Sequence, residues 1–169
     1  QPAEKAILQQ FLSQARSLAM NDEQPIKSRE AAFEFLLTAR ENIDIPILRS
    51  LLTTQTPADL QTVAIAFINR NTSAEVTRSL LDDWTSIDPL ISDQIITVLI
   101  QETESTGILL EAFKAKTLKP DNFNATHRQT LLAHPIEKIR REALTLFGMT
   151  SDQQRQDLIK RYLTITLQE

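Results

Sequence analysis

Apolar residues recur along the chain with the spacing of amphipathic helices. Three segments each carry an apolar triplet in an i, i+3, i+4 arrangement, which places the three side chains on one helical face. The triplets are Phe33, Leu36 and Leu37; Ala64, Phe67 and Ile68; and Ile95, Val98 and Leu99. The step from each triplet to the next is constant, at about 31 residues, and a fixed interval of this kind indicates one helical unit that is stacked several times.

Two further series keep step with the triplets. Proline belongs in turns and in the first turn of a helix. Four prolines are spaced almost evenly along the chain: Pro25, Pro57, Pro89 and Pro120. The letters RSLL occur at residues 49–52 and again at 78–81, and one more step of the same size leads to Leu109 and Leu110. Several interleaved series with nearly the same period strengthen the prediction of repeats.

Local capping signals place the helix boundaries. Thr56-Pro57 and Asp88-Pro89 each offer a capping side chain followed by proline at the first helical position, and Ser151-x-x-Gln154 matches a capping box. We predict an all-α fold of about nine or ten helices, at residues 3–20, 27–39, 46–54, 57–70, 74–85, 89–102, 105–116, 124–133, 135–147 and 152–167. The short connections make neighbouring helices antiparallel.

The repeat favours an α-solenoid of stacked helical hairpins over a compact helical bundle, because a bundle has no reason to repeat at a constant interval. We therefore predict a single α-solenoid domain of helical repeats over residues 1–169. Its expected parts are an N-terminal capping helix within 1–24, the repeats within 25–148 and a C-terminal capping helix within 149–169.

Composition narrows the possible chemistry. Two glycines and nine aromatic residues argue against a β-sandwich or barrel, which relies on glycine turns and aromatic strands. Without cysteine, the chain offers no disulfide, thiolate metal site or covalent c-type haem attachment. The longest apolar runs, such as residues 95–100, are far shorter than the roughly 18 residues of a membrane span. We expect no membrane insertion by this chain.

Charge is distributed unevenly. The net charge is −4, with −7 over residues 1–110 and +3 over residues 111–169. A sequence pI near 5.3 disfavours a nucleic-acid interface, which usually has a strongly basic surface. Four residues of the C-terminal third form a possible interaction surface for an acidic partner, although a solvated helix face explains them as well: Arg140, Arg141, Lys160 and Arg161.

Two histidines are the most conspicuous candidate ligands. His127 and His134 stand seven residues apart, which corresponds to a rise of about 10.5 Å along a helix, so one metal ion cannot bind both. We expect His127 to face solvent and His134, which precedes proline, to lie in a turn or cap. Asp82 and Asp83 point about 100° apart on a helix and suit a solvated face. Trp84 is expected in the core, and no catalytic residue is predicted.

The segment HPIEKIRREAL resembles the signature of HEAT repeats, in which a turn with proline leads into an apolar residue, arginine, two variable residues and alanine. These positions are Pro135, Ile139, Arg140 and Ala143. Residues 109–167 look more specifically like the helical-repeat region of large planctomycete-type proteins. In that family a membrane-bound-dehydrogenase-like β-propeller precedes the repeats, and a haem-binding cytochrome c domain follows them.

The resemblance implies a non-catalytic scaffold domain of a secreted or periplasmic redox protein, which spaces the propeller from the cytochrome c domain. This chain has no C-x-x-C-H motif, so no cofactor is expected in it and the haem would belong to the neighbouring domain. The expected partners are protein domains. The alternative is an independent binding module that docks an acidic partner through its basic C-terminal third.

Overall fold

The computed structural model describes residues 2–38 and 45–148, and every regular element within those ranges is helical. The elements are α1 (Pro2–Met20), α2 (Ile26–Thr38), α3 (Ile45–Ser50), α4 (Ala58–Arg70), α5 (Ala74–Asp82), η1 (Trp84–Ser86), α6 (Pro89–Leu99), α7 (Thr103–Lys114), η2 (Pro120–Asn122), α8 (Ala125–Leu132) and a helix over residues 137–148. The all-α prediction is confirmed. The predicted helix 152–167 lies outside the described residues.

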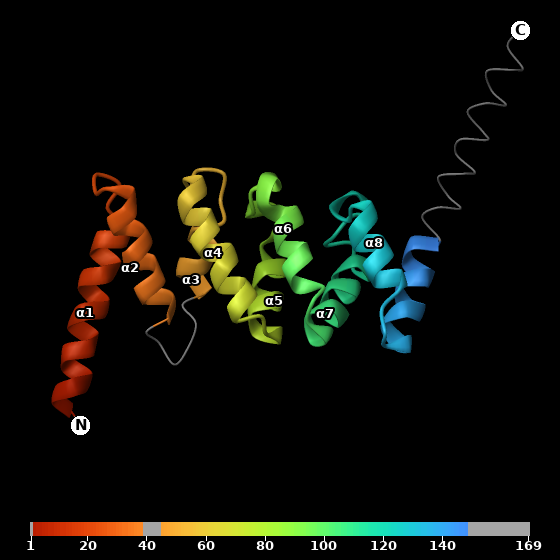
Figure 1. The fold of residues 1–169 in the computed structure, drawn as a ribbon, viewed down its shortest axis with the longest axis horizontal. Helices are drawn as coiled ribbons and strands as arrows, with labels where there is room; N and C mark the ends of the chain where they lie inside the picture. Colours follow the sequence, from red (N-terminus) through yellow and green to blue (C-terminus); the bar gives the residue numbers. More distant parts are fainter. Residues whose placement is uncertain (1, 39–44, 149–169) are drawn as a thin grey trace, which may run out of the picture.

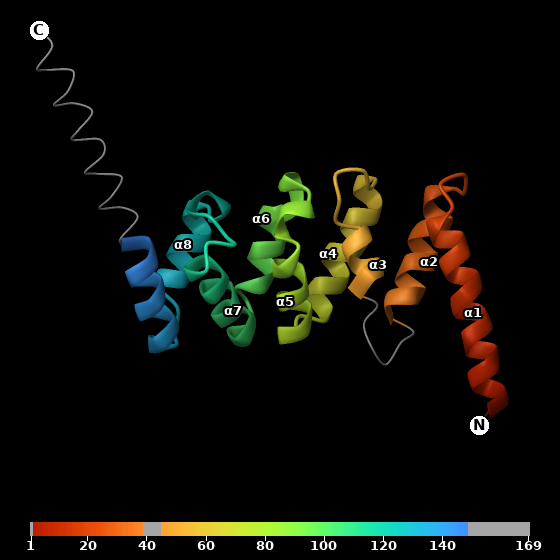
Figure 2. The same ribbon diagram turned by 180° about the vertical axis from the view of Figure 1, so that it is seen from behind.

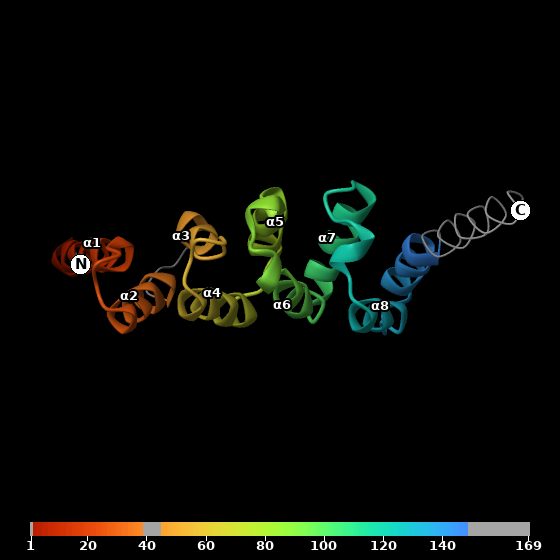
Figure 3. The same cartoon turned by 90° about the horizontal axis from the view of Figure 1, so that it is seen from above.

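The helices lie in one elongated row that follows the order of the sequence (Figure 1). The view from behind shows α1 and the helix of residues 137–148 at opposite ends of this row (Figure 2). Seen from above, α1, α3, α5 and α7 form one layer, and α2, α4, α6 and α8 form the other (Figure 3). Two layers of helices are the simplest way to bury one apolar stripe from each helix.

Contacts between helices connect neighbours within each layer and across the two layers. In one layer α2 packs on α4 and α4 packs on α6, while in the other α3 packs on α5 and α5 packs on α7. The layers are joined where α1 meets α2 and α6 meets α7. Each of these contacts joins helices that lie near each other in the row (Figure 1).

The apolar triplets supply the core of the layer that contains α2, α4 and α6. All nine side chains are buried except Val98, which is half-buried and packs against the core. Burying a leucine, isoleucine or phenylalanine side chain contributes about 1.5–3 kcal/mol relative to leaving it in water. The repeated pattern in the sequence therefore corresponds to a continuous apolar contact surface.

The two RSLL segments lie against each other. Arg49 donates from Nε to the carbonyl oxygen of Ser79 at 2.9 Å, so the first residue of one segment bonds to the second residue of the next. The leucines of both segments, together with Leu109 and Leu110, are buried. The second repeated series thus forms the core of the other layer.

Several predicted boundaries are wrong by a few residues. The predicted helix 46–54 ends at Ser50, where the chain turns and the Thr56 hydroxyl donates to the Ser50 carbonyl at 2.9 Å. Thr56 is therefore not the cap of the next helix; Pro57 is the last residue before α4, and no side chain caps that helix. The predicted helix 135–147 begins instead at residue 137. The Thr56 hydroxyl and the His134 ring each form a hydrogen bond with the backbone, and this bond competes with the backbone hydrogen bonds of a helix.

One capping prediction is confirmed in detail. Asp88 caps α6 by accepting a hydrogen bond from the Leu90 backbone N–H at 2.9 Å, with Pro89 at the first helical position. Its own backbone N–H donates to the Leu52 carbonyl at 2.8 Å. A hydrogen bond from Gln61 holds the pKa of the Asp88 carboxyl below its ordinary value, and the Leu90 N–H adds to this effect. Asp88 therefore starts one helix and fastens it to the preceding unit.

No helix within residues 2–38 and 45–148 combines the length and the apolar character that crossing a membrane requires.

Candidate functional site

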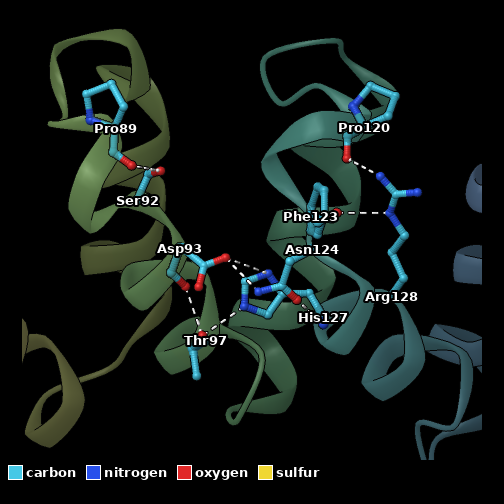
Figure 4. A network of polar contacts seen from close by, with 9 residues as sticks. All are labelled: Pro89, Ser92, Asp93, Thr97, Pro120, Phe123, Asn124, His127 and Arg128. Carbon is cyan, nitrogen blue, oxygen red and sulfur yellow. Dashed lines mark hydrogen bonds and ion pairs between the residues drawn. The ribbon is translucent and has the colours of Figure 1, made fainter.

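A network of polar contacts lies between α6 and α8. We call it the α6–α8 clasp; it consists of Asp93, Thr97, Asn124 and His127 (Figure 4). His127 Nε2 is 2.8 Å from the Thr97 hydroxyl oxygen, and Asn124 Nδ2 donates to Asp93 Oδ1 at 2.6 Å. Asn124 also accepts the His127 backbone N–H at 2.8 Å and thereby caps α8. One end of α8 is thus fixed to one face of α6.

His127 corrects the prediction of a solvent-facing ring. Its side chain is buried, with 1% of its surface exposed. Position 127 stands 32 residues after Ile95, one residue beyond the step of the triplet series, and the packing of α8 on α6 turns it into the core. The polar ring occupies an apolar position and reaches Thr97 from there. The triplet series gave no signal for this burial, because its next step leads to Thr126, Gln129 and Thr130, which are all exposed.

The hydrogen bonds of Thr97 indicate which ring nitrogen carries the proton. The Thr97 hydroxyl donates its single hydrogen to the Asp93 carbonyl at 2.8 Å, so it accepts the bond from His127 Nε2–H. The Nδ1 atom then keeps its lone pair. This atom is buried without a hydrogen-bond partner and lies 3.8 Å from Asp93 Oδ1. A bare acceptor beside a carboxylate is an unfavourable arrangement unless the ring takes up a proton.

Two effects on the His127 ring oppose each other. Burial lowers the pKa of the imidazole below its ordinary value of 6.5, because the charged form loses its hydration. The Asp93 carboxylate acts in the opposite direction and is the smaller effect. The folded protein therefore favours the neutral ring at neutral pH.

We expect the stability of the protein to fall as the pH drops below about 6.5, partly because of His127. In this range the unfolded chain binds a proton at position 127 while the folded chain resists it until the lowered pKa is reached. His127→Ile, which restores the residue type of position 95, should remove this contribution. Urea midpoints at pH 7.5 and pH 5.5 measure it, and wild type should lose more between the two than His127→Ile. Equal losses would contradict the assignment.

The order hydroxyl, imidazole and carboxylate resembles a catalytic triad, but the geometry does not perform that chemistry. A triad needs the hydroxyl proton to point to the imidazole and the carboxylate to accept from the other nitrogen. Here the Thr97 proton points to the Asp93 carbonyl, and the Asp93 carboxylate is 3.8 Å from Nδ1. The ring is also shielded from solvent. The clasp joins two helices.

Similar polar contacts join the earlier units. Gln61 Nε2 donates to Asp88 Oδ2 at 2.9 Å, and the hydroxyls of Thr77 and Ser105 are 2.7 Å apart in a fully buried position. With the Arg49–Ser79 contact, these pairs are separated by 27, 28 and 30 residues in the sequence. The two hydrogen bonds across the clasp are separated by 30 and 31. None of these partners was predicted, although polar residues one period apart were the available signal.

Two of the four predicted surface cations, Arg140 and Arg141, lie within the described residues. Arg140 is half-buried and donates to the His134 carbonyl at 3.1 Å, while Arg141 Nε lies 3.4 Å from Glu137 Oε1. Lys160 and Arg161 lie outside the described residues.

The HEAT-like segment packs through its apolar residues and bonds through its arginine. Ile139 and Ala143 are buried, and Arg140 bonds to the preceding turn. Arg29 stands three residues before Ala32, as Arg140 stands three residues before Ala143. Arg29 likewise donates to a backbone carbonyl, that of Ala19, at 3.0 Å. These side chains hold turns against helices.

The remaining predictions concern His134, Trp84 and the paired aspartates. His134 lies in the turn as expected, and its Nδ1 accepts the Ile136 backbone N–H at 3.1 Å. Trp84 is buried, which confirms its place in the core. Asp82 is exposed and Asp83 is half-buried, where it accepts the Ser86 hydroxyl at 2.6 Å.

Metal ligands do not cluster in the part of the chain that the structure describes. Within it, no three histidine, aspartate or glutamate side chains gather in a way that could hold a metal ion. Comparison with known proteins gives no further assignment, since no family model, curated protein or solved structure matches this chain.

Proposed function

We propose that this chain is a HEAT/armadillo-like α-solenoid that works as a non-catalytic scaffold between protein domains. In such an architecture each unit contacts only its neighbours, so that the stack forms a stiff and extended body. The two layers of helices and their neighbour contacts agree with this arrangement (Figure 3).

One observation carries the proposal: polar side chains bond between successive units at nearly the same sequence separation. The series runs from Gln61–Asp88 through Thr77–Ser105 to Thr97–His127. Buried hydrogen bonds have strict geometry, and an unsatisfied partner costs about 1–3 kcal/mol. They therefore resist sliding and bending between units more than apolar contacts alone. A rigid spacer needs this property.

The resemblance adds a cellular setting to the proposal. The domain would lie between a β-propeller and a cytochrome c domain in a secreted or periplasmic redox protein, with haem held by the neighbouring domain. The gene that encodes this chain tests that setting: a C-x-x-C-H motif is expected after Glu169 and a run of strands before Gln1. If neither is encoded, the setting is wrong and the scaffold proposal stands on the structure alone.

Extension and stiffness are the physical properties that a spacer needs. The radius of gyration from small-angle X-ray scattering should clearly exceed the roughly 15 Å of a compact globule of this length. Nitroxide labels at Glu34→Cys in α2 and Gln129→Cys in α8 should give a single narrow distance distribution in pulsed electron–electron double resonance. The chain has no cysteine, so the labels attach only at these sites.

The matched control carries labels at Gln10→Cys and Glu34→Cys on the adjacent helices α1 and α2, which are in contact. Its distribution gives the width that comes from the labels themselves. A distribution for Glu34/Gln129 that is much broader than this control, or that has two peaks, would refute a rigid spacer.

A further inference from the structure

An open groove runs along α8, the last helix of its layer in the described chain. Its volume is about 650 Å³, and its lining includes Ala125, Arg128, Gln129, Leu132 and Ala133 of this helix. Leu132 is half-buried, whereas Ala125, Gln129 and Ala133 are exposed. The groove presents small and apolar surface beside the polar ends of Gln129 and Arg128.

The repeat identifies this groove as the face that receives another helix. On α6, the residues that face α8 are Asp93 and Thr97. The positions 32 residues later, the step from Pro57 to Pro89, are Ala125 and Gln129, and both line the groove. The groove on α8 is therefore equivalent to the surface of α6 that α8 itself covers.

The chain continues with a segment of the right pattern and length. Four apolar residues follow the i, i+3, i+4 rule within residues 152–167: Leu158, Ile159, Tyr162 and Leu163. His127 and Leu131, the buried residues of α8, stand 32 residues before Ile159 and Leu163. Sixteen helical residues would span about 24 Å. Residues 149–151 can bridge about 10 Å, which matches the usual 8–10 Å between packed helices.

We propose that residues 152–167 dock as a helix into the groove on α8 and close this end of the row. Ile159 then lies opposite Gln129, as His127 lies opposite Thr97, with the same sequence separation of 30 in both cases. The occupant is this chain's own C-terminal segment, which shields the apolar lining of the last unit from water. The inference rests on the repeat arrangement of the proposed scaffold and does not depend on its role between domains.

Cross-linking in the cysteine-free full chain tests the docking. Gln129→Cys combined with Ile159→Cys should react with a short bismaleimide to give an intramolecular loop, identified by mass spectrometry of the monomer. The matched control is Gln129→Cys with Arg161→Cys, because position 161 is rotated about 200° around a helix from position 159. The facing pair should cross-link on the order of tenfold faster than the control, since its effective concentration is higher.

Two results would overturn the proposal. Equal rates for the two pairs would show that the segment does not present one face to α8. Cross-linked dimers in place of monomeric loops would show that a second copy of the chain fills the groove. Neither result changes the distance distribution expected between α2 and α8, so a failure here is distinguishable from a failure of the scaffold proposal.

Discussion

Phe123→Ala is expected to lower the free energy of unfolding by about 3–5 kcal/mol, the usual loss when a fully buried aromatic side chain is removed. Phe123 is 1% exposed and belongs to a cluster of three aromatic rings. Its ring centroid is 5.3 Å from that of Phe113 in α7 and 5.4 Å from that of Phe147 in the last described helix. Removing it opens a cavity between three elements at once. Equilibrium urea denaturation measures the loss.

Phe35→Ala in α2 is the matched control, because Phe35 is 37% exposed and its truncation should cost less than about 1 kcal/mol. Because the helices contact their near neighbours in the row, we also expect the effect of Phe123→Ala to stay local. Hydrogen exchange of backbone amides in Phe123→Ala should accelerate in α7 and α8 and stay near wild type in α1 and α2. A uniform acceleration along the chain would indicate one cooperative core and would contradict the stacked arrangement.

Thr77→Val is expected to destabilise the protein by about 1–3 kcal/mol, the cost of leaving a buried polar group without its partner. The Thr77 hydroxyl donates to the Ser73 carbonyl at 2.8 Å and so accepts from the Ser105 hydroxyl, 2.7 Å away. Valine keeps the shape but removes both bonds. Both side chains have no exposed surface, so water cannot replace the lost partner.

The two single substitutions should differ in their loss of stability, because Ser105 donates and Thr77 accepts the hydrogen bond between them. Ser105→Ala should cost less than Thr77→Val, since Thr77 keeps its bond to Ser73 when Ser105 loses its hydroxyl. The double variant should lose less than the sum of the two single losses, because the unsatisfied serine is gone as well. Urea denaturation of the four proteins gives the comparison. A larger loss for Ser105→Ala, or strict additivity, would contradict the assigned hydrogen bonds.

The apolar periodicity predicted the helices well because it reports a physical need of each helix. A helix in a two-layer arrangement must bury one stripe, and the triplets mark that stripe in α2, α4 and α6. Asp88-Pro89 predicted the start of α6 for an equally local reason, since a capping side chain and proline act within one turn.

Predictions failed where a local signal competed with longer-range contacts. Thr56 has the chemistry of a helix cap, yet its hydroxyl bonds back to Ser50 in the preceding turn. His127 reads as a polar surface residue, yet the packing of α8 on α6 places it in the core. In each case the partner depends on the fold around the residue.

The sequence by itself determined the all-α class, the regular period of the helical units and the apolar face of the repeated helices, because these depend on side chains within a few turns of each other. Only the tertiary structure decided which polar groups meet between successive units. Asp93, Thr97, Asn124 and His127 come together because two helices that are one period apart in the sequence pack side by side. Hydrogen bonds need partners within about 3 Å, and only the packed layers bring those atoms to that distance.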